Sequence, residues 1–560
     1  MEEKTSVAWK IPARQDVPVG ELAAFFVTLR QAGQKTEVFL KPNYSQLGDP
    51  KTLDGVEAAV DHIRQVRDRQ GKIAIYGDYD IDGLTATALL ADVFDRLGIA
   101  YMTYIPDRFI EGYGLHAAAL VDLKKQGVDT VVTVDCGITA VEAVAEAAQV
   151  GLHVIVTDHH TLGPAEPAAA VALLNPLRPT SQYPERLLSG VGVAFTLARA
   201  LQAAFPEELP AGQEKWLLDL VALGTVCDVV PLVGENRILA YYGLQVARRS
   251  RRAGLRVLAE ISGCTVAGLT ARDFGFKIGP RLNAAGRLEH ARTALELLMT
   301  QDTQQATQLA RQLNELNMAR RAITERMTTE ALAQAAEYHE DPILVLSSSD
   351  WSHGVAGLVA SRVAEAEGKP TIILQVEGKT AKGSARSFGR FSLITALRDS
   401  TELFERFGGH DAAAGITLSV GNIAKLRQAL IAFCDSDEQR ATLVREISAD
   451  AWLLGEYVSQ AGLDQLALLE PTGQANPEIR FYFRGELGDV RWVGADQDHA
   501  QMQFTVDGQP LRCIAFQAKR QWAWLEPGLD VEAILVLQGS EWNGMKRVEG
   551  QILHVRKAQA

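Results

Sequence analysis

Three short apolar segments, each rich in β-branched residues, are followed by acidic residues, directly in two cases and after one glycine in the first. They cover residues 72–76, 130–134 and 153–157, and alanine-rich stretches at 84–97 and 140–149 lie between them. This alternation of strand-like and helix-like segments predicts an α/β domain whose parallel sheet has helices on both faces. In such sheets a binding site lies at the carboxyl ends of the strands, which is where these acidic residues fall. We therefore expect an acidic site at one edge of the sheet.

The rest of the chain predicts further elements. Segments at 101–105 and 170–174 are expected to add strands to the first sheet. Apolar residues at helical spacing, such as Leu309, Leu313 and Leu316, predict a helix of about 30 residues, roughly 45 Å long, that joins two domains. Strand-like segments at 342–346 and 371–374 predict a second, smaller α/β domain. A small β-barrel or β-sandwich is expected after residue 476, with strands at 480–485, 501–506, 511–516 and 531–537.

Residues 77–83, which read Gly-Asp-Tyr-Asp-Ile-Asp-Gly, are the most informative stretch. The aspartates Asp78, Asp80 and Asp82 occupy alternate positions and would repel one another unless a cation lies among them. One alternative is an acidic helix N-terminus, which the helix dipole favours. A calcium loop is the other, but its liganding positions would continue, whereas residues 84–89 begin a helix-like stretch.

Further ligand-type residues follow the later apolar segments. Asp135 ends the second segment, Asp158-His159-His160 ends the third, and Asp228 follows another apolar run. A single histidine is more often a core residue, but two in tandem beside an aspartate offer nitrogen and carboxylate ligands together. Oxygen ligands with one imidazole suit Mn²⁺ or Mg²⁺ better than zinc. Two such ions, roughly 3.5–4 Å apart, activate water and stabilise the leaving oxygen of a phosphodiester, so these residues predict a two-metal phosphoesterase.

Composition limits the remaining possibilities. The 560 residues exceed what one hydrophobic core holds, so we expect about three domains. No apolar run reaches the roughly 18–20 residues that cross a bilayer, and the polar start lacks a signal-peptide pattern, which predicts a cytoplasmic protein without membrane contact. The five scattered cysteines contain no CxxC pair, which argues against a disulfide framework or a thiolate zinc site. The net charge of −13 disfavours nucleic acid as a partner, but local charge clusters decide such binding.

A series of motifs runs in order along most of the chain. They lie at residues 77–83, 104–115, 134–138, 157–160, 188–194, 223–237, 279–287, 354–362, 383–387, 408–415 and 470–477. In this order they resemble the DHH phosphoesterase superfamily and, within it, the RecJ-type exonucleases. The resemblance implies an N-terminal extension at 1–45, a DHH catalytic domain at 46–300 and a connecting helix at 301–340. A DHHA1 domain at 341–455 and an OB-fold-like domain at 456–560 would follow.

Carried over residue by residue, the resemblance implies a catalytic metal site with two divalent ions, Mn²⁺ or Mg²⁺. The implied ligands are Asp78, Asp80, Asp82, Asp135, His159 and Asp228. Asp78 is either a ligand or an immediate neighbour of the ions, and Asp135 is expected to bridge them. Asp158 would orient the site from outside the ligands, and the catalytic His160 would face the scissile phosphate.

The resemblance also implies a DNA path that admits one strand and excludes a duplex. Its residues would be Arg108, Tyr113, His160, Arg281, Asn283, Arg287, Ser384, Arg386, Gly408, Gly409 and His410. Glycine-rich backbone such as Gly408-Gly409 allows close approach to phosphate. The chain departs from the family pattern at Phe388-Gly389-Arg390, where an acidic residue and glycine are expected, and at Ala475, where glycine is usual.

The implied activity is 5′→3′ degradation of single-stranded DNA to 5′-mononucleotides, in DNA repair and recombination. By resemblance, single-strand-binding protein and a RecQ-type helicase are candidate partners. The alternatives are a phosphodiesterase for short oligonucleotides or cyclic dinucleotides, and a non-catalytic replication scaffold. The β-rich tail favours a long polymer over the first alternative, and the complete set of acidic residues argues against the second.

Overall fold

The computed structural model describes residues 7–30, 35–108, 110–542 and 545–558. They form two compact units. The larger unit contains residues 15–317, 453–479 and 483–560, and the smaller unit contains residues 318–452 with 1–14 and 480–482. Phe109 of the motif at 104–115, and residues 1–6 and 31–34 of the expected N-terminal extension, lie outside the described residues.

A five-stranded sheet organises the first part of the larger unit. Its strand order is β3-β2-β4-β5-β6, and every neighbouring pair is parallel. The strands are β2 (Lys72–Gly77), β3 (Ala100–Tyr104), β4 (Thr130–Val134), β5 (His153–Thr157) and β6 (Ala172–Leu174). These pairings confirm the predicted parallel sheet. The prediction succeeded because a sheet covered on both faces is built from continuous runs of buried, β-branched residues.

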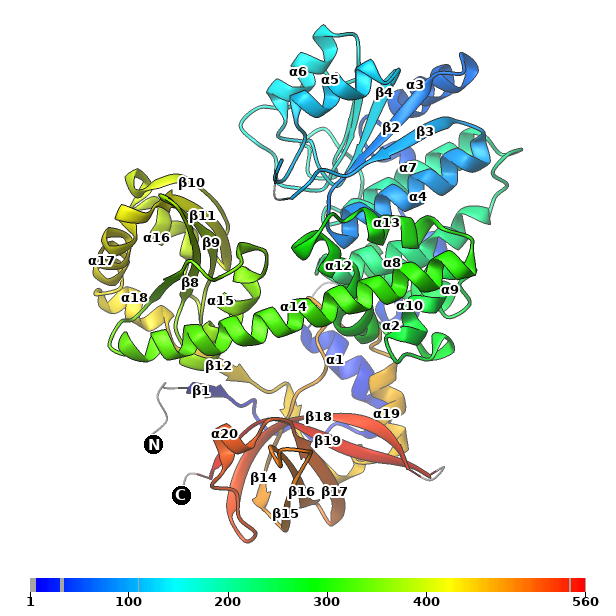
Figure 1. The fold of residues 1–560 in the computed structure, drawn as a ribbon. Helices are drawn as coiled ribbons and strands as arrows, with labels where there is room; N and C mark the ends of the chain where they lie inside the picture. Colours follow the sequence, from blue (N-terminus) through cyan, green and yellow to red (C-terminus); the bar gives the residue numbers. More distant parts are fainter. Residues whose placement is uncertain (1–6, 31–34, 109, 543–544, 559–560) are drawn as a thin grey trace. The chain divides into compact units, whose positions relative to one another are not determined.

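Helices cover both faces of this sheet (Figure 1). One layer contains α3 (Val56–Asp68), α4 (Ile81–Leu97) and α7 (Gly190–Ala204), and the other contains α5 (Ala117–Lys125) and α6 (Val141–Gln149). Successive strand residues point to opposite faces, so Ile73 and Ile75 join the core beneath the first layer. Ala74 and Tyr76 join the core beneath the second.

A helical region follows the sheet in the larger unit. Its helices are α8 (Leu218–Cys227), α9 (Gly234–Ala247), α10 (Ala253–Ile261), α11 (Ala271–Asp273), α12 (Gly279–Leu288) and α13 (Arg292–Met299). The N-terminal helices α1 (Leu22–Arg30) and α2 (Thr36–Leu40) belong to the same unit. The predicted long helix is confirmed as α14 (Thr303–Glu337), which has 35 residues. It begins in the larger unit, where Ala306 and Leu313 are buried, and ends in the smaller unit, where Met327 and Ala331 are buried.

The smaller unit is built on a mixed five-stranded sheet of order β10-β11-β9-β8-β7. Only β7 and β8 pair in parallel. The strands are β7 (Leu344–Ser348), β8 (Thr371–Glu377), β9 (Thr380–Arg386), β10 (Phe404–Gly409) and β11 (Ala413–Ser419). The helices are α15 (His353–Glu367), α16 (Leu393–Arg398), α17 (Ile423–Phe433) and α18 (Asp437–Thr442). A separate parallel pair joins β1 (Val7–Lys10) to β12 (Arg445–Ser448).

The C-terminal residues form a mixed seven-stranded sheet of order β13-β14-β18-β19-β17-β16-β15. Its strands are β13 (Ala451–Trp452), β14 (Phe481–Glu486), β15 (Asp489–Val493), β16 (His499–Val506), β17 (Gln509–Ala515), β18 (Asp530–Trp542) and β19 (Met545–Lys557), with helices α19 (Gln460–Ala467) and α20 (Lys519–Trp522). The sequence did not predict β13, β15 and β19. Charged residues such as Arg547, Glu549 and Arg556 interrupt the apolar pattern of β19, which pairing with β18 nevertheless keeps extended.

Among the described residues, no helix is both long enough and apolar enough to cross a lipid bilayer.

Buried Arg237, on α9, ties distant segments of the larger unit together. Its Nε donates to the carbonyl oxygen of Phe39 at 2.9 Å. Its two terminal nitrogens donate to four successive carbonyl oxygens, those of residues 468–471, at 2.9–3.3 Å. Burial lowers the pKa of this guanidinium to about 10, although the charge of Glu470 opposes that shift. The segment before the C-terminal sheet is therefore anchored on the helical region.

We expect Arg237→Met to lower the free energy of unfolding by about 3 kcal/mol, because it leaves several buried carbonyl groups without donors. Arg237→Lys should rescue little, since one ammonium cannot reach five acceptors. Thermal melting measures the effect, with Arg256→Met at an exposed position of α10 as the control. An unchanged melting temperature for Arg237→Met would contradict the anchoring role.

Candidate metal centre

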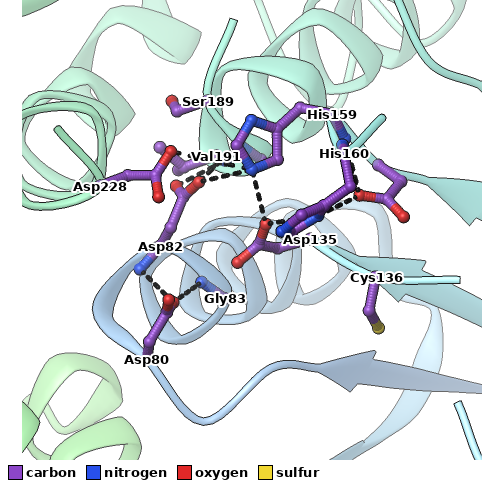
Figure 2. Close-up of polar contacts among 12 residues, drawn as sticks. Asp80, Asp82, Gly83, Asp135, Cys136, His159, His160, Ser189, Val191 and Asp228 are labelled. Carbon is purple, nitrogen blue, oxygen red and sulfur yellow. Dashed lines mark hydrogen bonds and ion pairs between the residues drawn. The ribbon is translucent and has the colours of Figure 1, made fainter. Parts of the chain in front are cut away.

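Acidic residues and two histidines converge at the carboxyl edge of the parallel sheet (Figure 2). Asp78 follows β2, Asp135 follows β4, and Asp158 with its two histidines follows β5. Asp228 directly follows α8. Parallel strands end at one edge, so residues 80 positions apart in sequence become neighbours in space. The acidic site expected at this edge is present.

Asp80 and Asp82 occupy the turn that starts α4. Asp80 is the N-cap residue, and its Oδ1 accepts hydrogen bonds from the amides of Asp82 and Gly83 at 2.9 and 3.1 Å. Asp82 is 1% exposed, and the first amides of α7 hold both of its oxygens. The amide of Gly190 donates to Oδ2 at 2.6 Å, and that of Val191 donates to Oδ1 at 2.9 Å. The N-terminus of α7 thus stabilises and orients a carboxylate that would otherwise be costly to bury.

Asp135 adopts an uncommon backbone conformation, with φ at +62°. Such strain is tolerated where the surroundings impose it, and it clusters at functional sites. Gly190 supplies part of these surroundings, because a Cβ atom at Gly190 would lie 2.6–2.7 Å from the side chain of Asp135. The absence of a side chain at Gly190 is therefore required for the position of Asp135.

His159 presents an unprotonated nitrogen to three carboxylates. Its Nδ1 donates to the carbonyl oxygen of Leu188 at 3.0 Å, which leaves Nε2 as the lone-pair atom of the neutral ring. Nε2 lies 3.1 Å from Asp135 Oδ1, 3.7 Å from Asp228 Oδ2 and 3.9 Å from Asp82 Oδ2. Burial, and then the charge of His160, lower the pKa of His159 to about 4, so the ring is neutral near pH 7. A lone pair facing carboxylate oxygens is repulsive unless a cation separates them.

His160 is held in a different way. Its Nδ1 donates to Asp158 Oδ1 at 2.8 Å, and the hydroxyl of Tyr113 lies 3.2 Å from the same nitrogen. Burial opposes the charged form of His160, but the hydrogen bond and charge of Asp158 outweigh it and raise the pKa. Asp158 also accepts from the amides of Ile138, His159 and His160. These bonds occupy Asp158, so it orients the histidine pair and does not face the cluster of carboxylates.

The donor set fits divalent cations. Within the described residues, four buried atoms of the cluster make no hydrogen bond: Asp78 Oδ1, Asp135 Oδ1, Asp228 Oδ2 and His159 Nε2. Burial, and then the neighbouring carboxylates, raise the pKa of Asp78 and Asp135, raise that of Asp82 to about 7 and raise that of Asp228 to about 9. Cations would reverse these shifts, because they favour the charged carboxylates.

The possible ligand atoms fall into overlapping groups. Three groups of residues each offer ligand atoms that lie within 4.8 Å of one another. They are Asp78, Asp80 and Asp135; Asp82, His159 and Asp228; and Asp135, His159 and His160. Asp135 belongs to two of these groups. All six sequence-predicted ligands therefore lie in one cluster, and their oxygen-rich chemistry with one neutral imidazole matches Mn²⁺ or Mg²⁺.

The sequence-predicted DNA contacts of the larger unit border this cluster. The guanidinium of Arg108 lies 5.2 Å from the ring centroid of Tyr79, and Tyr113 contacts His160. Arg281, Asn283 and Arg287 are on α12, which packs on the aspartate-rich loop: a Cβ atom at Gly286 would lie 3.1 Å from the carbonyl oxygen of Tyr79. Arg281 donates to the side chain of Asn314 and to the carbonyl oxygen of Lys277.

The remaining predicted contacts cluster in the smaller unit. Ser384 on β9 pairs with Gly415, which pairs with Gly408 on β10. Arg386 Nη1 donates to Ser384 Oγ at 2.9 Å, and the amide of His410 donates to the carbonyl oxygen of Ala413 at 2.9 Å. Gly409 has φ at +151°, and a Cβ atom there would lie 2.3 Å from that same carbonyl oxygen. These residues therefore form one polar surface at the end of three strands.

Both departures from the family pattern include a residue with positive φ. Gly389 takes φ at +62°, and a Cβ atom there would lie 2.4 Å from the carbonyl oxygen of Thr442, so a glycine is still required in this turn. Ala475 takes φ at +59°, a conformation that glycine adopts more readily.

Known proteins match this chain over most of its length. Residues 72–225 match the DHH family, N-terminal domain, residues 340–436 match the DHHA1 domain, and residues 449–554 match the RecJ OB domain. The single-stranded-DNA-specific exonuclease RecJ of Dickeya dadantii is 36% identical over 545 residues, which cover 94% of each chain. The chain belongs to the RecJ family.

Other RecJ proteins agree with this assignment. RecJ of Bacillus subtilis is 35% identical over 518 residues, and the match covers 92% of this chain and 65% of that protein. A crystal structure of Thermus thermophilus RecJ in complex with Mn²⁺ superposes with a TM-score of 0.85 at 31% identity, covering 100% of this chain and 81% of that one. The Mg²⁺ complex of the same protein gives 0.78 at 30% identity, covering 99% and 79%. The expected fold of this RecJ family member is thereby confirmed.

Sequence reasoning missed the contributions of the backbone to this RecJ site. The carbonyl group of Leu188 and the amides of Gly190 and Val191 act through main-chain atoms, which any residue carries. The signal that could have indicated them is local. Ser189 followed by Gly190 and Gly192 is a helix N-cap with small residues, which allows close approach to a neighbouring group.

We expect Gly190→Ala to weaken Mn²⁺ binding by about tenfold or more, since the added methyl group would displace Asp135. Calorimetric titration with Mn²⁺ measures the affinity. Gly192→Ala is the matched control, because its nearest contact would be 3.3 Å, to Ser189 Oγ. Equal affinities for the two variants would show that Gly190 does not position the site.

Proposed function

We propose that this chain is a metal-dependent exonuclease that degrades single-stranded DNA in the 5′→3′ direction and releases 5′-mononucleotides. The observation that carries the proposal is the unprotonated Nε2 of His159, which faces the carboxylates of Asp82, Asp135 and Asp228. This arrangement is suited to two divalent cations. The substrate and the direction are supported by the RecJ relatives, which are single-stranded-DNA-specific exonucleases.

Each residue of the cluster has a proposed role. The proposed ligands are Asp78, Asp80, Asp82, Asp135, His159 and Asp228. Asp135 and His159 each belong to two ligand groups. Asp135 would be the ligand shared between the two ions, because its carboxylate has two oxygens, whereas His159 has only Nε2 to offer. When bound, the two ions would activate a water molecule and neutralise the leaving oxygen. With Nδ1 of His160 donating to Asp158, Nε2 of His160 is the atom that donates to an oxygen of the scissile phosphate. The raised pKa of His160 favours this donor form.

The rest of the chain would bind the strand. Arg108, Tyr113, Arg281, Asn283 and Arg287 contact it near the metal site, and Ser384, Arg386 and the Gly408-Gly409-His410 turn contact its phosphates from the smaller unit. The match to the RecJ OB domain supports a long polymer as substrate. The domain limits given by the resemblance, 46–300, 341–455 and 456–560, remain our proposed division of the chain.

The cellular setting is also a proposal. DNA as the substrate supports the cytoplasm as the place of action and DNA repair and recombination as the process. By resemblance to the family, single-strand-binding protein and a RecQ-type helicase are the proposed protein partners.

The test uses purified protein with Mn²⁺ and strands labelled at either end. We expect mononucleotide release from the 5′ end of single strands and little cleavage of blunt duplex. Asp135→Ala should lower turnover at least about a thousandfold while the protein stays folded, because the shared ligand is lost. Asp122→Ala, at an exposed position of α5, is the control. Near-normal turnover of Asp135→Ala would refute the two-metal assignment, and products from the 3′ end would refute the direction.

Removal of the C-terminal sheet should weaken the binding of long strands without changing the rate of hydrolysis at the metal site. Residues 476–560 contain ten basic and eleven acidic residues, so they exert little long-range attraction on DNA and would bind it by stacking and local contacts. The cut belongs after Ile479, because Arg237 holds residues 468–471 and the side chain of Arg30 donates to the carbonyl oxygens of Pro477 and Glu478.

We expect the chain of residues 1–479 to lose affinity for long strands and to hydrolyse short oligonucleotides at the normal rate. Turnover on both substrates at several salt concentrations, together with a melting curve, measures this. Equal losses on both substrates, with the truncated chain folded, would mean that the sheet supports the catalytic region and does not bind the strand.

A further inference from the structure

Val229 combines backbone strain with exposure beside the metal centre. It directly follows Asp228, the C-cap residue of α8, and has φ at +62°. A β-branched side chain in the left-handed region is a true outlier, since glycine is the usual residue at this position after a helix. The side chain of Val229 is nevertheless 62% exposed, so packing within the chain compensates for little of the strain.

Helix termination alone does not require a valine. Gln70 occupies the same place after α3, with φ at +56°, and it is exposed as well. Gln70 precedes β2 and therefore lies at the opposite edge of the sheet from the acidic cluster. The two positions share their backbone geometry, but only Val229 places an apolar branched side chain next to a proposed ligand.

Two other exposed apolar side chains adjoin the same cluster. Leu187 is 50% exposed and precedes Leu188, whose carbonyl group orients His159. Tyr113 is 44% exposed and contacts His160. Three separate segments next to this highly charged site thus expose apolar surface, which in Tyr113 is the ring, because its hydroxyl hydrogen-bonds to His160. The phosphate groups of a substrate would interact with cations. The exposed apolar side chains are therefore suited to contact the uncharged part of a nucleotide.

We propose that Val229 is a substrate-contact residue whose isopropyl group packs against the base of the nucleotide at the scissile bond. The inference rests on the proposed function. A base presents an apolar face whatever its identity, so this contact tolerates any sequence while it positions the nucleotide beside the metal site. The strain at Val229 persists because the contact is made with substrate and not within the chain.

The experiment pairs variants of Val229 with strands that lack one base. kcat/KM is measured on an intact 5′-labelled single strand and on strands with an abasic nucleotide at the first or the second position from the 5′ end. We expect Val229→Gly to lower kcat/KM about fivefold or more on the intact strand and less than twofold on one of the abasic strands. Val229→Ile, which keeps the branched shape, should retain activity on the intact strand.

Stability and metal binding provide the controls. Val229→Gly should leave the Mn²⁺ affinity unchanged and raise the melting temperature by about 2 °C, because it relieves strain. Gln70→Gly should raise the melting temperature in the same way and leave kcat/KM unchanged on all three strands.

Two outcomes would overturn the inference: an equal loss for Val229→Gly on all three strands, or no loss on the intact one. If the unmodified protein fails to degrade single-stranded DNA, the proposed function fails instead, so the two failures are distinguishable.

Discussion

Mutual repulsion among buried carboxylates at the end of the parallel sheet is the constraint on which the rest of this site depends. Asp78, Asp82 and Asp135 are each less than 5% exposed, and the charges of Asp78 and Asp82 raise the cost of charging Asp135. Two amides at the N-terminus of α7 lower this cost for Asp82, because they donate hydrogen bonds to its carboxylate. What remains is a set of unpaired oxygen atoms and one imidazole lone pair, and the natural counterpart of such a set is a pair of divalent cations.

Positioning in this site comes largely from the main chain. The carbonyl group of Leu188 selects the tautomer of His159, and three backbone amides hold Asp158. Asp135 and Val229 both take left-handed backbone conformations beside the cluster. Backbone strain and unpaired polar atoms are therefore concentrated at the proposed metal site, where both lower the stability of the fold. A tightly packed sheet, with helices on both faces, supports that site.

Strands of the first sheet could be predicted more accurately from the sequence than strands of the C-terminal sheet. The strands β4 and β5 could be predicted to the residue, because a sheet buried on both faces demands continuous apolar runs. The proposed ligands Asp135 and His159 followed from those strands, since parallel strands end at a common edge. The strand β19 escaped prediction because charged residues break its pattern. Its extended conformation is imposed by pairing with β18, a contact that no local pattern encodes.

The sequence by itself predicted the class of fold, and its ordered motifs indicated the family and the proposed acidic ligands, because buried strands and motifs are both local patterns of residue types. Tertiary structure decided what these residues can do. It placed the N-terminus of α7 against Asp82, turned Nε2 of His159 toward three carboxylates and left Val229 exposed at the rim. It also fastened residues 468–471 to Arg237. These contacts join residues 24 to 233 positions apart, several of them through main-chain atoms, and so they depend on the folded path of the chain and not on any local pattern.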